Sequence, residues 1–299
     1  MQDRPVILGI HGLANKPPRD EKQKWWEAAI REGLARNLGH DPSERLRFDF
    51  VYWADLRYGE PVTAGRNREP YYPARGRGPF PSPEAGPPPG PTLTDRVYRV
   101  LEWLQEKSGR LLVDDVFIEY RLDDLWGYYK DAAFRDAARE RLRAALAQHA
   151  GRPLLLAAHS MGSLIAYDVL RLLEADGAPP RRLHLVTMGA PLGLAEVKHR
   201  IDQEHGGLRV PAAVARWTNL SDRDDVATVG AALDEAYGPN AAGVRPVEHR
   251  VINAYRRPRG GTNPHKSYGY LRTPQFSRAV AAFLADETAE ARVEAEASA

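Results

Sequence analysis

The chain has 299 residues, of which 43% are hydrophobic and 27% charged, a balance typical of a folded protein rather than of a disordered or membrane protein. Its net charge of +2 creates no overall field that would attract nucleic acid or anionic lipid. The absence of cysteine excludes disulfides, thiolate nucleophiles and Cys-ligated zinc. The first apolar run, Val6–Ile10, is too short for a signal peptide, and no run approaches the roughly 18–20 residues that span a bilayer. We therefore expect a cytoplasmic protein without an integral membrane segment.

Short apolar runs alternate with helical patterns along the chain. The runs have the length of buried strands and are Val6–Ile10, Phe48–Trp53, Leu154–Ala158, Leu183–Met188, Val214–Leu220 and Val247–Ala254. The helical patterns are Trp25–Leu38, Leu93–Gln105, Ala132–His149, Ser163–Ala175 and Ser277–Leu284. This alternation predicts an α/β fold with a mostly parallel central sheet flanked by helices.

One region interrupts this alternation. Residues Gly59–Pro91 are rich in Pro, Gly and Arg, which favours a long loop of polyproline character. We expect it to belong to an insertion at about residues 56–130 that acts as a lid or cap. The remainder of residues 1–287 is expected to be a single domain, and the Ala/Glu-rich residues 288–299 to be a frayed tail.

The strongest chemical signal follows the third strand. Residues 154–163 read as an apolar strand, then Ala-His-Ser-Met-Gly, then a helix, which is the arrangement of a nucleophile elbow around Ser160. A sharp turn lifts the serine hydroxyl clear of the sheet and needs small residues two positions before and after it, here Ala158 and Gly162. The turn also opens a helix, so the Met161 N–H is expected to face a developing oxyanion.

A second signal is the His11-Gly12 pair at the end of the first strand. Gly12 allows the chain to bend closely, and we assign the second oxyanion donor to the backbone N–H of Leu13.

The base is expected to be a histidine after the last strand, and His265 has that position. His40, His149, His199 and His205 lie in polar segments and are expected to be solvated. In enzymes with this elbow the acid lies between the serine and the histidine, as it does in Ser221-Asp222-Arg223-Asp224-Asp225. We favour Asp224 because an apolar residue, Val226, follows it two positions later; Asp225 and Asp222 remain alternatives.

These motifs resemble those of the bacterial α/β-hydrolase-fold lipases and esterases. Ala158–Gly162 looks like the Ala-x-Ser-x-Gly elbow of small Bacillus-type lipases, and residues 265–268 look like the His-x-x-Tyr around their catalytic histidine. The resemblance covers the first strand and residues 154–271, roughly half of the chain. It implies a triad of Ser160, His265 and an acid at 222–225, with Leu13 and Met161 forming the oxyanion hole.

The predicted function is therefore hydrolysis of a small-molecule carboxylic ester through an acyl-enzyme. An acyltransferase or amidase with the same triad is the alternative, and a non-catalytic binding protein of this fold is a third possibility. We expect no cofactor, no metal and no nucleic-acid partner; the sequence makes no prediction of oligomeric state.

Overall fold

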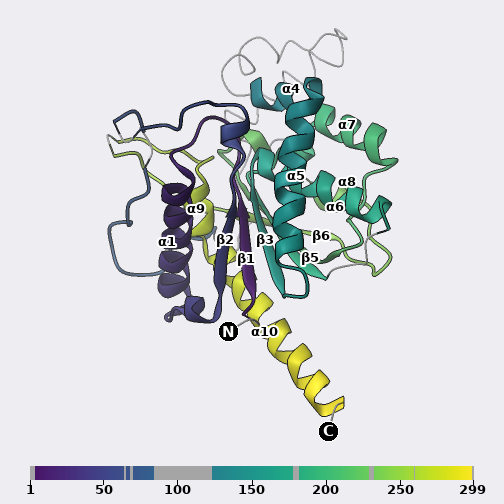
Figure 1. Cartoon of the computed structure of the whole chain (residues 1–299). Coiled ribbons are helices and arrows are strands. Elements are labelled where there is room, and N and C mark those ends of the chain that lie inside the picture. The colour runs from purple at the N-terminus through teal and green to yellow at the C-terminus, as the bar shows by residue number, and fades with distance from the viewer. Residues whose placement is uncertain are drawn as a thin grey trace.

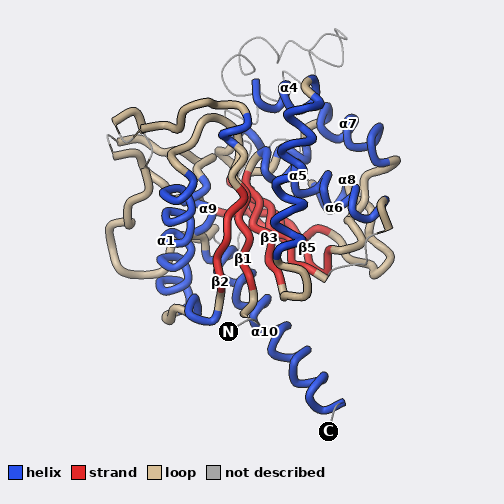
Figure 2. Tube along the Cα trace, in the orientation of Figure 1, coloured by secondary structure: helices blue, strands red, loops and turns tan. Residues whose placement is uncertain are grey.

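The computed structural model describes residues 4–63, 65–67, 70–83, 123–177, 182–228, 232–258 and 260–297. Within these residues the chain forms one central sheet with helices on both faces (Figures 1 and 2). The predicted α/β class and its mostly parallel sheet are confirmed.

All strand pairs in the sheet are parallel, and the spatial order is β2-β1-β3-β4-β5-β6. The strands are β1 (Val6–Ile10), β2 (Arg47–Val51), β3 (Leu154–His159), β4 (Leu183–Met188), β5 (Val214–Asp222) and β6 (Pro246–Val251). β1, β3 and β4 are buried along their whole length. Continuous burial explains why their sequences are unbroken apolar runs, because parallel strands covered by helices need apolar side chains on both faces.

The helices divide into two layers. They are α1 (Arg19–Leu38), α4 (Asp123–Lys130), α5 (Ala132–Gln148), α6 (Met161–Ala175), α7 (Ala195–His205), α8 (Leu233–Ala236), α9 (Ser267–Leu271) and α10 (Pro274–Ala297). Helices α1, α9 and α10 pack on one face of the sheet and α4 to α8 on the other (Figure 1). Each layer closes one hydrophobic core, with Trp26 and Phe276 central to the first and Trp53 and Trp217 to the second.

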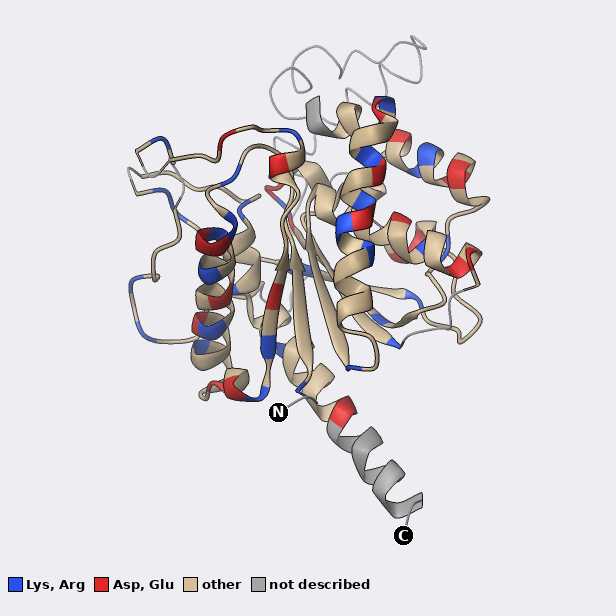
Figure 3. Cartoon of the chain, viewed as in Figure 1, with Lys and Arg blue, Asp and Glu red and all other residues tan. Residues whose placement is uncertain are grey.

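Local sequence signals set the ends of several helices. The α5 N-terminus is capped by Asp131, whose carboxylate accepts the Phe134 N–H at 3.1 Å. Helix α1 ends at its C-terminus with Gly39. This residue adopts φ 74°, the left-handed conformation that ends helices and favours glycine. Acidic and basic residues are interspersed along α1 and α5 (Figure 3).

The structure extends several predicted elements. β5 continues to Asp222, past the predicted end at Leu220, and α6 begins at Met161 rather than Ser163. Helix α10 runs to Ala297, where a frayed tail was expected, and projects away from the body of the molecule (Figure 1). The predicted helix Leu93–Gln105 lies outside the described residues. No helix in the described ranges is long and apolar enough to span a membrane.

The part of the Pro-rich segment that the structure describes packs against α1 and α10 and is hydrogen-bonded to both. Phe80 is buried beneath the Arg36 guanidinium, which lies 3.9 Å from the centre of its ring. The Tyr71 hydroxyl donates to Glu32 at 3.0 Å, and the Gln275 amide donates to Ser82 at 2.8 Å. Most of the predicted lid, residues 84–122, lies outside the described residues.

Candidate active site

Ser160 lies in a sharp turn between β3 and α6. Its backbone has φ 55° and ψ −129°, a conformation that L-residues rarely adopt and that marks strain at functional turns. Its N–H donates to the Met188 carbonyl at 2.9 Å, so the turn remains tied to the neighbouring strand β4. The geometry agrees with the elbow predicted from residues 154–163.

Two glycines allow the turn to approach the end of β1. A Cβ atom added to Gly12 would lie 2.4 Å from the Cβ and 3.0 Å from the Oγ of Ser160. One added to Gly162 would lie 2.6 Å from the His11 carbonyl oxygen. His11 and Gly12 therefore lie directly against the turn that carries the nucleophile. Met161 is the first residue of α6, where backbone N–H groups have no partner within the helix.

The loop that carries Leu13 is held at both ends. The Trp53 N–H donates to His11 Nε2 at 3.0 Å, so His11 Nδ1 carries the proton and donates to the Gly12 carbonyl at 2.8 Å. Burial lowers the pKa of His11 well below 6.5, and the charge of Lys16 lowers it further. Lys16 Nζ in turn donates to the carbonyls of Leu13 and Ala14. The loop is thus ordered around a neutral imidazole and a lysine.

His265 lies between Ser160 and Asp225. Its Nε2 is 2.9 Å from Ser160 Oγ, and its Nδ1 is 2.8 and 2.9 Å from the two carboxylate oxygens of Asp225. A carboxylate only accepts, so Nδ1 carries the proton and Nε2 is free to accept the serine proton. Asp225 is buried, whereas 21% of the His265 side chain is exposed. The three side chains have the arrangement of a serine nucleophile, its base and an orienting acid.

The structure places Asp225, rather than the favoured Asp224, against His265. Because β5 runs to Asp222, the following turn spans 222–225 and is closed by the Asp225 N–H, which donates to the Asp222 carbonyl at 3.1 Å. Asp224 is exposed on this turn, and its N–H donates to the Asp222 carboxylate at 2.8 Å. Asp222 also accepts the Asn253 N–H at 2.6 Å, so its carboxylate shapes the loops behind the site.

Tyr270 and Asn253 support this arrangement and were not identified from the sequence. The Tyr270 hydroxyl donates to Asp225 Oδ2 at 2.6 Å, and burial together with the Asp225 charge raises its pKa well above 10. The Asn253 amide donates to the carbonyls of Pro264 and Lys266 at 2.7 and 2.8 Å. Both residues lie near the predicted histidine in the chain, but no local pattern distinguishes them from core residues.

His159, directly before the nucleophile, contacts the histidine loop. Its Nε2 lies 2.8 Å from the His265 carbonyl oxygen, so this nitrogen carries a proton and donates it. Burial lowers the pKa of His159 well below 6.5, and the neighbouring His265, with ring centroids 4.8 Å apart, lowers it further. The elbow and the histidine loop are therefore joined by a neutral imidazole.

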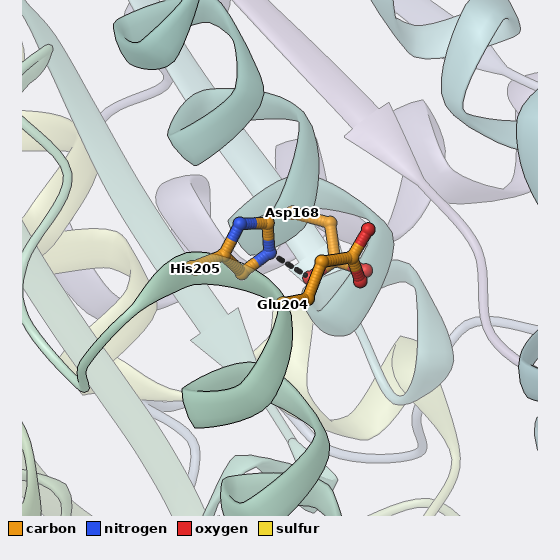
Figure 4. A group of neighbouring side chains, drawn as sticks. All are labelled: Asp168, Glu204 and His205. Atoms are coloured by element: carbon orange, nitrogen blue, oxygen red, sulfur yellow. Dashed lines mark hydrogen bonds and ion pairs between the residues drawn. The ribbon is translucent and has the colours of Figure 1, made fainter.

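A second group of polar side chains lies between α5, α6 and α7. Ligand-type atoms of Asp168, Glu204 and His205 lie within 4.8 Å of one another (Figure 4). The Arg139 guanidinium bonds both carboxylates, at 2.7 Å to Asp168 and 2.6 and 2.8 Å to Glu204, and Tyr128 donates to Asp168 at 2.7 Å. With a cation already between the carboxylates, this group is a buried ion-pair network rather than a metal site.

The structure corrects the expectation that four histidines are solvated, for two of them. His205 donates to Asp168 over 2.9 Å and its side chain is only 4% exposed. His149 is 1% exposed and lies 3.0 Å from the Asp49 carboxylate. The prediction that these two histidines are solvated is wrong, because each is held by a carboxylate distant in the chain.

The fold and the serine elbow define a serine hydrolase of the α/β-hydrolase type, as the motifs predicted. The family model for the Thioesterase domain matches residues 111–297, more than half of the chain, so the chain belongs to the Thioesterase domain family. It is similar to the crystal structure of TT1662 from Thermus thermophilus, with 16% identity, coverage of 95% of this chain and 89% of that chain, and a TM-score of 0.30. Among curated proteins no match was found.

Proposed function

We propose that Ser160, His265 and Asp225 form the catalytic triad of an enzyme that hydrolyses acyl esters, thioesters among them. One observation carries this proposal: His265 contacts Ser160 Oγ at 2.9 Å and Asp225 at 2.8 Å, beside a strained elbow. The predicted acid is thereby revised from Asp224 to Asp225. Membership of the Thioesterase domain family supports thioesters as substrates beside the oxygen esters predicted from the motifs.

In the proposed first step, Ser160 Oγ attacks the acyl carbonyl carbon while His265 Nε2 takes the hydroxyl proton. Asp225 accepts the hydrogen bond from the Nδ1–H group throughout and stabilises the imidazolium that forms. The carbonyl electrons move to oxygen, where the N–H groups of Leu13 and Met161 are proposed to receive the negative charge. The intermediate then collapses: the bond to the leaving oxygen or sulfur breaks, His265 returns its proton to that atom, and the acyl group remains on Ser160.

Water completes the proposed cycle. His265 Nε2 takes a proton from water as its oxygen attacks the acyl-enzyme carbonyl, and the second tetrahedral intermediate expels Ser160 with that proton. The products are a carboxylic acid and an alcohol or thiol, so no further reactant is required.

A fluorophosphonate probe tests this proposal, because it phosphonylates serines activated by a neighbouring base. We expect one adduct, located on Ser160 by peptide mass spectrometry and lost in Ser160→Ala and His265→Ala. Turnover of an oxygen ester and a thioester with the same acyl group would then establish the leaving group that is preferred. A folded wild-type protein that neither reacts with the probe nor turns over either ester would refute the assignment.

A further inference from the structure

The last strand of the sheet is an open edge. β6 pairs with β5 along Trp217–Asp222, and no strand in the described ranges lies on its other side. Apart from that ladder, the described residues contribute one hydrogen bond to the β6 backbone, from the Gln275 amide to the Arg250 carbonyl over a long 3.4 Å. An edge strand with unpaired backbone groups is a template for pairing with another chain.

Exposed apolar side chains are concentrated at this edge. In the part of the chain that the structure describes, the large hydrophobic side chains that are exposed are Val247, at 50%, and Ile252, at 41%. One belongs to β6 and the other follows it directly. Glu248 and Arg250 stand between these apolar residues, so this edge presents both charged and apolar side chains to a pairing strand.

The residues of β6 are complementary to their own sequence in reverse. If a second copy runs antiparallel with His249 facing His249, then Glu248 faces the partner's Arg250. Val247 lies opposite the partner's Val251, whose side chain is 3% exposed and packs in its own core. Two-fold symmetry repeats both pairs on the other side of the centre. Opposite-charge pairs across antiparallel strands are favourable. We propose that a second copy of this chain pairs with β6 in this register, extending the sheet across a two-fold axis.

The local charges agree with this register. The Glu248 carboxylate lies on the face of the sheet covered by α8, where it accepts the Leu233 N–H at 3.2 Å and two bonds from Asn219. Neighbouring Asp234 adds negative charge there, and burial followed by that charge raises the pKa of Glu248. The chain's own Arg250 acts against this rise, and the partner's Arg250 would bring a second positive charge to this face. At the centre, burial and Arg278 lower the pKa of His249, so the facing imidazoles are uncharged at neutral pH.

Sedimentation velocity on the full chain tests the association itself. We expect a reversible monomer–dimer equilibrium over a range of protein concentrations. Arg250→Glu would place two carboxylates opposite one another in both symmetric pairs, and it should raise the dimer dissociation constant about tenfold. Arg4→Glu is the matched control, since Arg4 is exposed beside β1, which three strands separate from β6. A monomer at all concentrations, or a dimer insensitive to Arg250→Glu, would overturn the proposal.

Cross-linking tests the register, and the chain is suited to it because it contains no cysteine. Directly opposed residues of antiparallel strands have Cα atoms about 4.5–5.5 Å apart, within the range of a disulfide. His249→Cys should therefore give a covalent dimer under mild oxidation that a thiol reductant reverses. Val247→Cys should not, because its two copies would be offset by four residues, about 13 Å. Equal cross-linking of both variants, or of neither, would contradict this register.

The inference does not depend on the proposed catalytic function. Retained fluorophosphonate labelling of Ser160 in these variants would show that they are folded, because none of the substituted residues contacts the site.

Discussion

Replacing the carboxylate of Asp225 by an amide is the most direct test of the site. The two oxygens of Asp225 lie 2.8 and 2.9 Å from His265 Nδ1, and they also accept the Tyr270 hydroxyl at 2.6 Å and the Ala227 N–H at 3.0 Å. Either orientation of an asparagine brings its NH₂ group next to Nδ1, and this favours the histidine tautomer that is protonated on Nε2. That tautomer cannot accept the proton of Ser160.

The expected loss follows from this geometry. The same substitution in serine proteases with this triad lowers kcat about 10⁴-fold while the structure stays intact. At about 1.36 kcal/mol for each factor of ten, Asp225→Asn should raise the activation free energy by about 5 kcal/mol. The assay is the initial rate of hydrolysis of a chromogenic short-chain ester, with thermal unfolding recorded in parallel to confirm the fold.

Asp224→Asn is the matched control, one residue away in the same turn. Asp224 is exposed, so its substitution should change the rate by no more than about twofold. If Asp224→Asn lost activity to the same extent as Asp225→Asn, or if Asp225→Asn retained it, the assignment of Asp225 would be refuted.

Three further outcomes are expected. Gly12→Ala places a methyl group 2.4 Å from the Ser160 Cβ and should lower kcat/KM for ester hydrolysis about 100-fold. The control is Gly78→Ala, whose added methyl group meets open space and should leave kcat/KM unchanged. Asp168→Asn breaks the buried ion-pair network and should lower the free energy of unfolding by about 3–5 kcal/mol in urea. Burial alone would raise the pKa of Asp168, but its partners lower it below 3.8, so this contribution is complete above that pH and is lost on further acidification. Burial lowers the pKa of His159, so below pH 6.5 the unfolded chain binds a proton that the folded protein does not. The free energy of unfolding should therefore fall by about 1.4 kcal/mol per pH unit below pH 6.5, and urea midpoints of His159→Gln should lack this pH dependence.

The architecture could be predicted because its signals are local. Buried parallel strands are apolar along their whole length, so runs such as Val6–Ile10 and Leu183–Met188 were identified with their observed bounds. The short helices α7 and α9 were not predicted. The first has a mostly polar sequence, and the second consists of only five residues, so neither carries a clear helical period.

The residues of the site divide into those that lie in local motifs, which could be predicted, and those whose position depends on tertiary structure, which could not. Ser160, Gly12 and His265 lie in motifs whose spacing follows from backbone geometry, and the structure brings them together. The choice between Asp224 and Asp225 depended on where β5 ends, and strand ends are set by pairing with neighbouring strands rather than by local sequence. His205 and its carboxylate partner Asp168 are 37 residues apart, so their contact exists only in the folded chain.

The backbone of Ser160 has a consequence for the evolution of this chain. A φ of 55° with ψ −129° suits glycine, and it costs a residue with a Cβ about 1–3 kcal/mol. Ser160→Gly should therefore yield a protein that is inactive yet harder to unfold than the wild type. A lineage free from selection for chemistry would gain stability by losing its serine at this position. A serine at this position therefore works against the folding preference of its own backbone.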